Sequence, residues 1–315
     1  MIIFVTTALH GYTIARLRPL PGMPQLRQWS YERLFRTRLF ARATYVLTDF
    51  DRLKVADIEA AARFYDALQA RGLRVLNDPR QFLPRDMLLR HLHRCGVNSF
   101  DIWRPGDGET PTRYPVFLRT IAAHRGALSE LLDSAGQAET ALREALAAGH
   151  PIADLVFVEY VGQPTAAGKF EKRAAHMLGD EIFAAPTANQ AHWMAKFGEK
   201  GAGTPEGYRQ ELDETRAYPH TETLRRVFKI AGAQYGRADF ALRDGRVEVF
   251  EVNTNPYFSF SESHPNPDRL QTLEILKTRL AESLRSIDTP RSIWPLSLHR
   301  DLRTIRYKGA QRRYP

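Results

Sequence analysis

Gly236-Arg-Ala-Asp-Phe-Ala-Leu-Arg-Asp-Gly-Arg-Val-Glu-Val-Phe-Glu-Val-Asn-Thr-Asn-Pro256 is the stretch of this sequence that decides the fold. Its apolar residues flank Asp244-Gly245, a dipeptide typical of tight turns, and so predict two antiparallel strands over 236–242 and 246–252. This pairing brings Asp239 on the first strand close to Glu251 and Asn253 on the second. Glu251 and Asn253 are two residues apart on a strand, so they point to the same face.

This set of oxygen ligands has two interpretations. Mg²⁺ prefers carboxylate and carbonyl oxygens and shares its octahedron with phosphates, so two acids and an amide on one face of an apolar hairpin indicate a magnesium site. Alternatively, the same acids keep a solvent-facing edge soluble. The spacing alone does not choose between these interpretations.

The chain before residue 105 predicts a parallel sheet. The apolar opening reads as a buried first strand, with no basic leader or cleavage site of a signal peptide. A strand over 43–50 is followed by a helix over 54–70, which ends before Gly72, and by a short strand over 73–76. A second helix is expected over 84–95. This alternation of strands and helices favours an α/β domain with a crossover helix.

The rest of the chain predicts α+β lobes. A turn-rich break at 104–111 is the expected domain junction, followed by a strand at 114–118, a helical stretch at 127–148 and a strand at 154–161. Two strands are expected within 173–185, joined at Gly179-Asp180. The polar segment 191–216 is expected to be a mobile loop, followed by helices over 221–235 and 267–285. The predicted division is therefore 1–105, 106–162, 163–290 and a basic tail, 291–315.

Composition limits the class of protein. The chain has 315 residues, of which 43% are hydrophobic and 26% charged, as in ordinary globular proteins. No window approaches the ~18 consecutive apolar residues of a membrane span, so an integral membrane protein is not expected. The single cysteine, Cys95, excludes an internal disulfide and a cysteine-based zinc cluster, and a cytoplasmic location is expected.

The net charge of +9 indicates an anionic partner. Part of this excess lies in the last sixteen residues, which read as a solvated C-terminal segment. Nucleic acid is not favoured, because basic and aromatic residues are not interleaved at any one place in the sequence. An anionic substrate is the remaining interpretation, and peptides and phosphorylated metabolites both fit it.

The hairpin resembles the terminal metal-binding hairpin of the ATP-grasp superfamily of carboxylate–amine ligases. Further segments are similar to that family in the same order: 72–79 with 85–96, then 114–119, and then 156–161. The resemblance covers roughly residues 72–285. It implies an ATP-grasp fold, with an N-terminal parallel-sheet domain and two α+β lobes that hold ATP and Mg²⁺.

The resemblance also implies roles for individual residues. Asp239, Glu251 and Asn253 are expected to hold one or two Mg²⁺ ions that bridge the ATP phosphates. Arg85 and Arg119 stand where the family has two phosphate-contacting lysines, and Arg119 is expected to act in catalysis as well. Arginine keeps the positive charge but changes the geometry, because it donates through a planar fork.

Other expected roles concern the nucleotide and the substrate. Glu159 and Val161 are expected to present backbone groups to adenine. Glu171 and Arg173 resemble the family's acid-x-Arg pair, in which Arg173 meets the γ-phosphate or the acyl phosphate as a catalytic residue. Arg173 is also expected, together with Lys196 and Arg237, to hold the carboxylate substrate. The 193–216 segment is a candidate lid.

One departure from the family is the loop after Arg119. The family has a glycine-rich loop here, whereas 120–126 contains one glycine and two cationic candidates, His124 and Arg125. The activity that the resemblance implies is ATP-dependent joining of a small-molecule or peptide carboxylate to an amine through an acyl phosphate. Two alternatives remain: an ATP-binding protein of the same fold without ligase activity, and a metal-dependent glycosyltransferase that uses Asp49 and Asp51.

Overall fold

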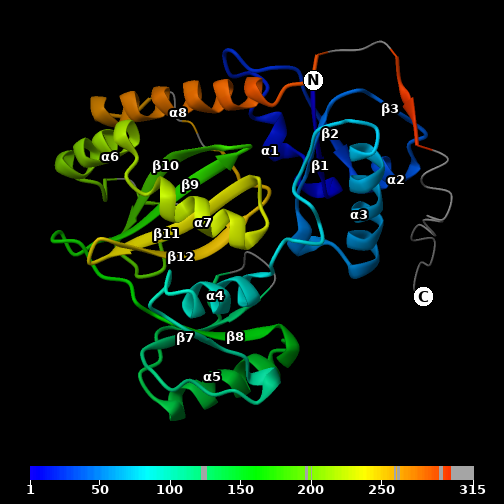
Figure 1. Ribbon diagram of the computed structural model, residues 1–315. Coiled ribbons are helices and arrows are strands. Elements are labelled where there is room, and N and C mark those ends of the chain that lie inside the picture. The colour runs from blue at the N-terminus through cyan, green and yellow to red at the C-terminus, as the bar shows by residue number, and fades with distance from the viewer. Residues whose placement is uncertain are drawn as a thin grey trace.

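The structure is a computed structural model that describes residues 1–121, 126–195, 198–199, 201–258, 260, 263–290 and 294–298. The N-terminal domain holds a four-stranded parallel sheet in the order β2-β1-β4-β5, as the sequence predicts (Figure 1). The elements of this domain are β1 (Ile2–Thr6), α1 (Tyr12–Ala15), β2 (Leu26–Ser30), α2 (Tyr31–Arg36), β3 (Leu39–Phe40), β4 (Thr44–Leu47), α3 (Val55–Gln69) and β5 (Val75–Leu76).

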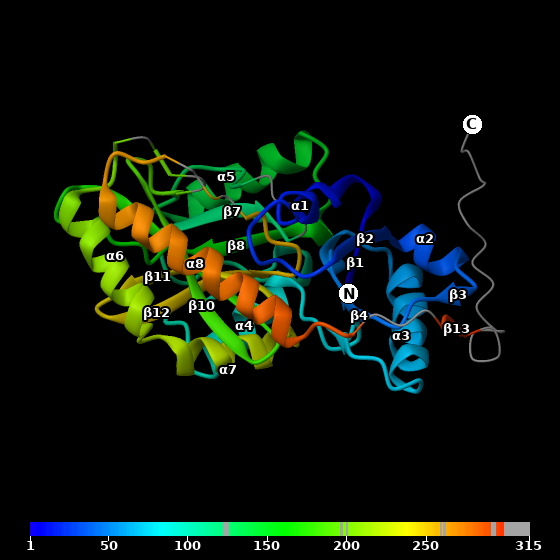
Figure 2. The same ribbon diagram turned by 90° about the horizontal axis from the view of Figure 1, so that it is seen from above.

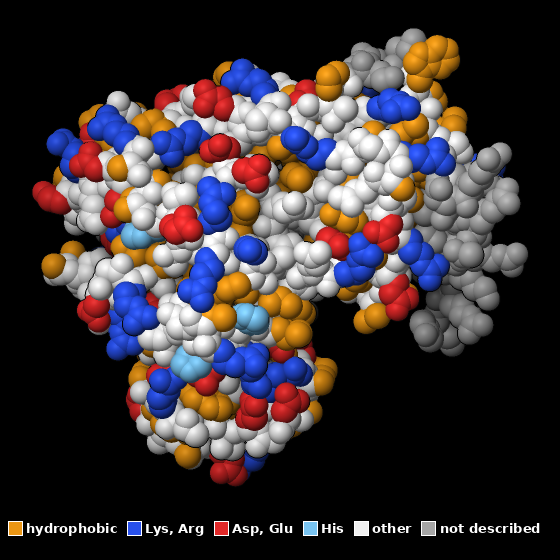
Figure 3. Space-filling view, viewed as in Figure 1, with side chains coloured by type: hydrophobic (Ala, Val, Ile, Leu, Met, Phe, Trp, Pro, Cys, Tyr) orange, Lys and Arg blue, Asp and Glu red, His pale blue; other side chains and the backbone are white. Residues whose placement is uncertain are grey.

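A small lobe follows helix α4 (Arg85–Arg94), and the space-filling view shows it projecting from the body of the molecule (Figure 3). Its three-stranded antiparallel sheet has the order β6-β8-β7, and its elements are β6 (Ile102–Trp103), β7 (Val116–Thr120), α5 (Ala135–Ala147) and β8 (Leu155–Glu159). β6 precedes the predicted boundary at residue 106, so the lobe begins earlier than expected. The helix predicted over 127–148 begins only at Ala135, where Ser134 caps it by accepting a hydrogen bond from the backbone N–H of Gln137.

The large lobe is built on a four-stranded antiparallel sheet in the order β10-β9-β11-β12. Its first strands turn at Gly179-Asp180 and its last at Asp244-Gly245, as predicted. Helix α8 runs over this lobe toward the N-terminal domain (Figures 1 and 2). The elements are β9 (Phe170–Leu178), β10 (Glu181–Gln190), α6 (Pro205–Ala217), α7 (Thr221–Ala231), β11 (Tyr235–Arg243), β12 (Arg246–Asn253) and α8 (Pro267–Ser286), after which β13 (Leu296–Ser297) pairs with β3.

Helix α6 corrects the prediction of a mobile loop over 191–216. Thr204 caps the helix by accepting a hydrogen bond from the backbone N–H of Gly207, and Pro205 occupies its first turn. The helix buries Leu212 and Thr215 against the lobe. The glycines just before it conceal this Thr-Pro start signal in the sequence.

Three buried asparagines fasten the parts of the molecule together. Asn77 donates to the carbonyls of Leu47 and Tyr235, which lie in the N-terminal domain and the large lobe, and it accepts from the backbone N–H of Tyr235. Asn98 exchanges two 2.9 Å hydrogen bonds with the backbone of Val249 on β12. Asn255, described with the site, makes the third connection. Each amide satisfies backbone groups that burial would otherwise leave without partners.

The hydrophobic core runs through the same joint. One buried cluster combines residues of β1 and α1, among them Phe4 and Ile14, with the sheet and helices of the large lobe, among them Tyr235 and Leu280. The N-terminal domain and the large lobe therefore share a core. The small lobe has a separate apolar cluster on the α5 side of its sheet.

Candidate functional site

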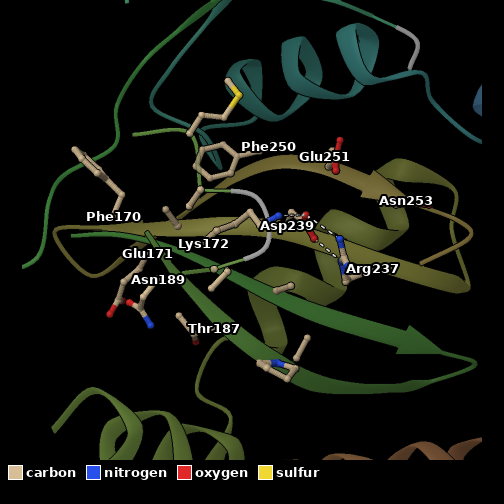
Figure 4. Close-up of a pocket in the computed structure, with 18 of the residues that line it drawn as sticks. Phe170, Glu171, Lys172, Thr187, Asn189, Arg237, Asp239, Phe250, Glu251 and Asn253 are labelled. Carbon is tan, nitrogen blue, oxygen red and sulfur yellow. Dashed lines mark hydrogen bonds and ion pairs between the residues drawn. The ribbon is translucent and has the colours of Figure 1, made fainter. Parts of the chain in front are cut away.

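A cavity of about 1430 Å³ opens between the small lobe, the large lobe and the loop after β1. Its floor is the face of the β9–β12 sheet that carries Asp239 and Glu251 (Figure 4). Known ligand sites occupy roughly 300–1,000 Å³, so this cavity has room for a nucleotide and a second molecule. The site residues predicted from the sequence that line it are Arg119, Glu159, Val161, Glu171, Asp239, Glu251 and Asn253, whereas Arg85 and Arg173 do not.

Asp239 and Glu251 lie close together on β11 and β12, as the sequence predicts, and the structure places them directly opposite each other. The register then shifts, because Phe240 pairs with Val249 and leaves Phe250 as the extra residue of a β-bulge. As a result, both Phe250 and Glu251 line the cavity. The bulge therefore adds an aromatic wall beside the two carboxylates.

Asp239 is buried and held by two cations. Its carboxylate accepts hydrogen bonds from Arg237, at 2.6 Å (Oδ1) and 3.0 Å (Oδ2), and from Nζ of Lys172 at 3.2 Å (Figure 4). Burial by itself raises the pKa of this carboxyl, but the charges of Arg237 and Lys172 outweigh burial and hold the pKa at about 2. Asp239 is therefore an anion throughout the physiological range.

Glu251 is paired with Arg85 at the start of α4. Nη1 of Arg85 also donates to the carbonyl oxygen of Ile121 at 3.1 Å, just before the undescribed residues 122–125. Burial lowers the pKa of Arg85 to about 10, although nearby carboxylates act against this shift. Arg85 and Glu251 thus connect the helix before the small lobe to the hairpin.

Arg119 projects from β7 into the cavity and forms no ion pair with any carboxylate in the part of the chain that the structure describes. Burial and the like charge of Arg85 together lower the pKa of its guanidinium to about 9. A half-buried arginine without a carboxylate partner is a position that favours an incoming anion.

Asn253 and Asn255 join the end of the hairpin to the N-terminal domain. Oδ1 of Asn253 accepts a hydrogen bond from the backbone N–H of Asn255 at 2.8 Å. The side chain of Asn255 accepts from Oγ1 of Thr13 at 2.7 Å and donates to Oδ1 of Asp49 at 3.0 Å. The loop after β1 is thereby held against the end of the cavity that carries Asn253.

The structure does not place Arg173 where the sequence analysis expects it. Arg173 does not line the cavity; its guanidinium pairs with Glu214 of α6 and lies 3.3 Å from Oε2 of Glu171. Its neighbour Lys172 lines the cavity instead and contacts Asp239. Lys172 points to the same face of β9 as Ala174, which lines the cavity, whereas Ala175 on the face of Arg173 lies in the core. The pairing of β9 with β11 decides which face is which.

The end of the cavity beside the small lobe is apolar and aromatic. Glu159 and Val161 lie there as expected, and the Glu159 carboxylate is engaged by the backbone N–H of Asp101 at 3.0 Å and by Arg113 at 2.8 Å. This engagement keeps the side chain of Glu159 occupied. The aromatic residues of this end are Phe100, Phe117, Tyr160, Phe170, Trp193 and Phe250.

His176 is a cavity residue that the sequence analysis missed. It is buried beside Arg237 on the floor and stacks on Phe258, with ring centroids 4.4 Å apart. Burial and the charge of Arg237, opposed in part by Asp239, lower the pKa of its imidazole to about 3, so the ring is neutral at physiological pH. Its strand parity with Lys172 could have identified it as a cavity residue.

Other predicted positions lie elsewhere. His124, Arg125 and Lys196, like residues 299–315 of the basic tail, are outside the described residues. Asp49, proposed for the glycosyltransferase alternative, is fully buried; it accepts from Arg52 at 2.7 Å, from the backbone N–H of Thr7 at 2.8 Å and from Asn255. Unlike Asp239, Asp49 does not line the cavity, so its position is that of a structural residue.

The donor set fits Mg²⁺ together with a nucleotide. No group of three or more His, Cys, Asp and Glu side chains that could hold a metal ion occurs among the described residues. The two carboxylates and the Asn253 oxygen leave further octahedral positions to phosphate oxygens and water. Arg119, Lys172 and Arg237 line the cavity with these two carboxylates, and Arg85 contacts Glu251 without lining the cavity, so cationic side chains surround the pair of acids.

Comparisons with known proteins give structural likenesses only. No family model matches the sequence, and no curated protein does. D-alanine–D-alanine ligase from Bacillus anthracis complexed with ATP matches at 10% identity and a TM-score of 0.47, over 91% of this chain and 97% of that one. The ATP-grasp ligase PsnB, complexed with a phosphomimetic variant of minimal precursor, Mg and ADP, matches at 15% and 0.48, over 91% and 96%.

A third similar structure is the RimK domain protein ATP-grasp from Sphaerobacter thermophilus, at 14% identity and a TM-score of 0.47, over 92% of this chain and 99% of that one. The chain is thus similar to ATP-grasp proteins of known structure. At such identities the likeness does not extend to activity or substrate. The described helices include none long and apolar enough to cross a membrane.

Proposed function

We propose that this protein is an ATP-dependent carboxylate–amine ligase of the ATP-grasp type. The observation that carries the proposal is the cross-strand pair Asp239–Glu251 on the cavity floor, faced by Arg85, Arg237 and Lys172. Two acids held by three cations in one cavity are a suitable receptor for metal-bound phosphates, because the phosphates attract the cations and the metal attracts the acids.

The proposed nucleotide lies between the small lobe (106–162) and the large lobe (163–290). Its adenine occupies the apolar end, beside Tyr160 and the backbone of Glu159 and Val161. Its phosphates extend toward Arg85, Arg119 and Lys172. Lys172 takes the place in this proposal that the sequence analysis gave to Arg173, and Glu171 lines the outer edge of the nucleotide site.

The proposed metal ligands are Asp239, Glu251 and Asn253. Mg²⁺ bound there neutralises phosphate charge as a Lewis acid. On binding of Mg²⁺ and ATP, Lys172 and Arg85 exchange their carboxylate partners for phosphate oxygens. Arg237, which lies two residues before Asp239 on β11, then holds the carboxylate substrate for the reaction.

The proposed reaction has two steps. An oxygen of the substrate carboxylate attacks the γ-phosphorus, the bond to the β-phosphate oxygen breaks, and ADP leaves. An amine then attacks the carbonyl carbon of the acyl phosphate, inorganic phosphate leaves, and the amine loses a proton. The protein contributes positioning and charge stabilisation, mainly through Arg119 and Lys172. The substrates are small-molecule or peptide carboxylates and amines.

Calorimetric titration with ATP, with and without Mg²⁺, tests the site. Wild type is expected to bind ATP in a Mg²⁺-dependent manner, and Asp239→Asn/Glu251→Gln is expected to lose that dependence. Asp66→Asn/Glu109→Gln is the matched control, because both of its carboxylates pair with arginines outside the cavity. Absence of binding to wild type contradicts the proposal.

ADP release from pools of amino acids and dipeptides then tests ligase activity. The expected result is release that depends on both a carboxylate and an amine and that disappears in the double variant. Mg²⁺-dependent binding without ADP release from any pool favours the alternative of a nucleotide-binding protein without ligase activity.

A further inference from the structure

The mouth of the cavity carries aromatic side chains that the proposed reaction does not use. His10, Tyr12 and Tyr257 all line the cavity. Tyr12 on α1 is nevertheless 52% exposed, and Tyr257, in the segment after β12, is 38% exposed. The two tyrosines therefore lie at the boundary between the cavity and the solvent.

These side chains form one continuous surface. The ring centroid of Tyr12 lies 6.2 Å from that of His10 and 6.3 Å from that of Tyr257. The guanidinium carbon of Arg16, at the end of α1, lies 4.7 Å from the centroid of the Tyr257 ring. We call His10, Tyr12, Tyr257 and Arg16 the aromatic rim. It joins the loop after β1 to the segment after the hairpin.

Hydrogen bonds hold the N-terminal part of the aromatic rim in place. The carbonyl oxygen of His10 accepts from Oγ1 of Thr13 at 3.0 Å and from Nδ2 of Asn255 at 3.3 Å. Nδ1 of the His10 ring lies 2.6 Å from Oγ1 of Thr7. A surface that is already ordered loses little conformational freedom when a ligand binds. The aromatic rim is thus suited to recognition.

The aromatic rim begins beside the residue proposed to hold the carboxylate substrate. Nη1 of Arg237 donates to the carbonyl oxygen of Tyr257 at 3.3 Å. A free amino acid whose carboxylate is held by Arg237 ends inside the cavity and leaves the exposed parts of Tyr12 and Tyr257 in water. A ligand that covers both rings must continue out of the cavity.

The chemistry of the aromatic rim favours a peptide. Tyrosine offers a large, rigid contact area with little loss of side-chain entropy and is common where proteins bind peptide chains. Alternate side chains of an extended peptide are about 6.6–6.8 Å apart, close to the spacing of the rings. The exposed guanidinium of Arg16 contacts a ring and, among the described residues, pairs with no carboxylate, so it is available to an acidic side chain.

We propose that the aromatic rim binds an acidic peptide whose reacting carboxylate reaches Arg237, so that the carboxylate substrate is a peptide and not a free amino acid. This inference rests on the proposed function and narrows its substrate class. Alternate side chains of the peptide pack on Tyr12 and Tyr257, and an acidic side chain pairs with Arg16.

Fluorescence anisotropy without nucleotide tests the proposal. The probe is a pool of fluorescein-labelled hexapeptides made of Asp, Glu, Phe and Leu, with free C-terminal carboxylates. Unlabelled pools of the same amino acids, free or joined in chains of two, four and six residues, compete with it. The hexapeptides are expected to bind about tenfold or more tighter than the free amino acids. Equal competition by the free amino acids overturns the proposal, as does absence of binding of the labelled pool.

The proposed function and this inference can fail separately. Failure of wild type to bind ATP contradicts the proposed function, whereas the peptide measurement contains no nucleotide and reports on the aromatic rim alone. Mg²⁺-dependent ATP binding together with no advantage of hexapeptides over free amino acids overturns only the peptide inference.

Variants identify the surface that binds. Tyr12→Ala/Tyr257→Ala is expected to lose the gain in affinity with peptide length, whereas Tyr12→Phe/Tyr257→Phe keeps it because the rings remain. Arg16→Gln is expected to lose the preference for the acidic pool over a pool with Asn and Gln in place of Asp and Glu.

The matched control is Tyr65→Ala, because Tyr65 also lies beneath an arginine, Arg80 at 5.8 Å, and is outside the cavity. It is expected to bind the hexapeptides as wild type does. An equal loss in Tyr65→Ala contradicts the proposal, as does full affinity in the double alanine variant. Thermal unfolding of each variant above the assay temperature establishes that it is folded.

Discussion

Replacing Arg119 with methionine is expected to stabilise the protein while it abolishes nucleotide binding. The ordinary pKa of an arginine is about 12.5, and burial and Arg85 lower the pKa of Arg119 to about 9. That difference corresponds to about 5 kcal/mol in favour of the neutral form. At pH 7 the group is charged in both the folded and the unfolded chain, so the difference opposes folding.

The measured increase in the free energy of unfolding is expected to be smaller than this upper value of about 5 kcal/mol. Arg119 is only half-buried by its accessible surface, so solvent screens part of its charge. Replacing a buried ion by an apolar side chain of similar volume stabilises proteins by about 1–4 kcal/mol, and methionine keeps the packing of the aliphatic stem. We therefore expect Arg119→Met to raise the free energy of unfolding by about 1–3 kcal/mol without nucleotide.

Urea unfolding with and without Mg²⁺ and ATP measures both effects. Wild type is expected to gain stability from the nucleotide, by mass action, and Arg119→Met to gain none. The control is Arg90→Met on α4, whose guanidinium is paired with Glu109 and has a raised pKa; it is expected to lose up to about 1 kcal/mol. The reasoning is refuted if Arg119→Met is less stable than wild type without nucleotide, or if ATP still stabilises it.

Three further predictions concern the site and its scaffold. The depressed pKa of Asp239 supplies about 2 kcal/mol of stability that is fully present above about pH 4 and is lost as the pH falls toward 2, so Asp239→Asn is expected to flatten the acid limb of urea unfolding measured from pH 7 to 2. Lys172→Met is expected to weaken Mg²⁺-dependent ATP binding at least about tenfold in calorimetry, as loss of a charge-assisted contact requires; unchanged affinity would remove Lys172 from the phosphate site. Gly232→Ala is expected to cost about 3 kcal/mol or more in thermal unfolding, because φ is +68° and a Cβ would overlap the carbonyl oxygen of Gln81, whereas Gly72→Ala, with φ +71° and open space, is expected to cost about 1 kcal/mol. Equal costs for the two alanines would refute the overlap at Gly232.

The local elements with strong periodicity and clear turn signals could be predicted from sequence. The strand pair around Asp244-Gly245, the helix that ends before Gly72 and the parallel order of the first strands are all in the structure. The turn sets the register only as far as Phe240↔Val249 and so predicted that Asp239 lies close to Glu251; the β-bulge at Phe250, which places the two directly opposite, could not be predicted from the turn.

What could not be predicted depends on contacts between distant segments. The pairing of β9 with β11 sets the faces to which Lys172 and Arg173 point. The acid-x-Arg resemblance indicated Arg173, whereas Lys172 is the one that lines the cavity. Asn255, which follows the hairpin, forms hydrogen bonds with Thr13 and Asp49, and both of these residues are more than 200 positions away in the sequence. The amino-acid sequence by itself, without the pairing of the strands in three dimensions, contains no sign of these contacts.

The buried asparagines determine where this molecule is able to bend. Asn77 and Asn255 fasten the N-terminal domain to the large lobe, so these two behave as one rigid body, with Asn98 extending that body to the segment just before β6. Relative motion is left to the small lobe, whose α5-side apolar cluster is separate. For the proposed nucleotide site, this arrangement predicts that any opening of the cavity moves the small lobe about the chain near residue 98 and near the end of β8, while the N-terminal domain and the large lobe stay together.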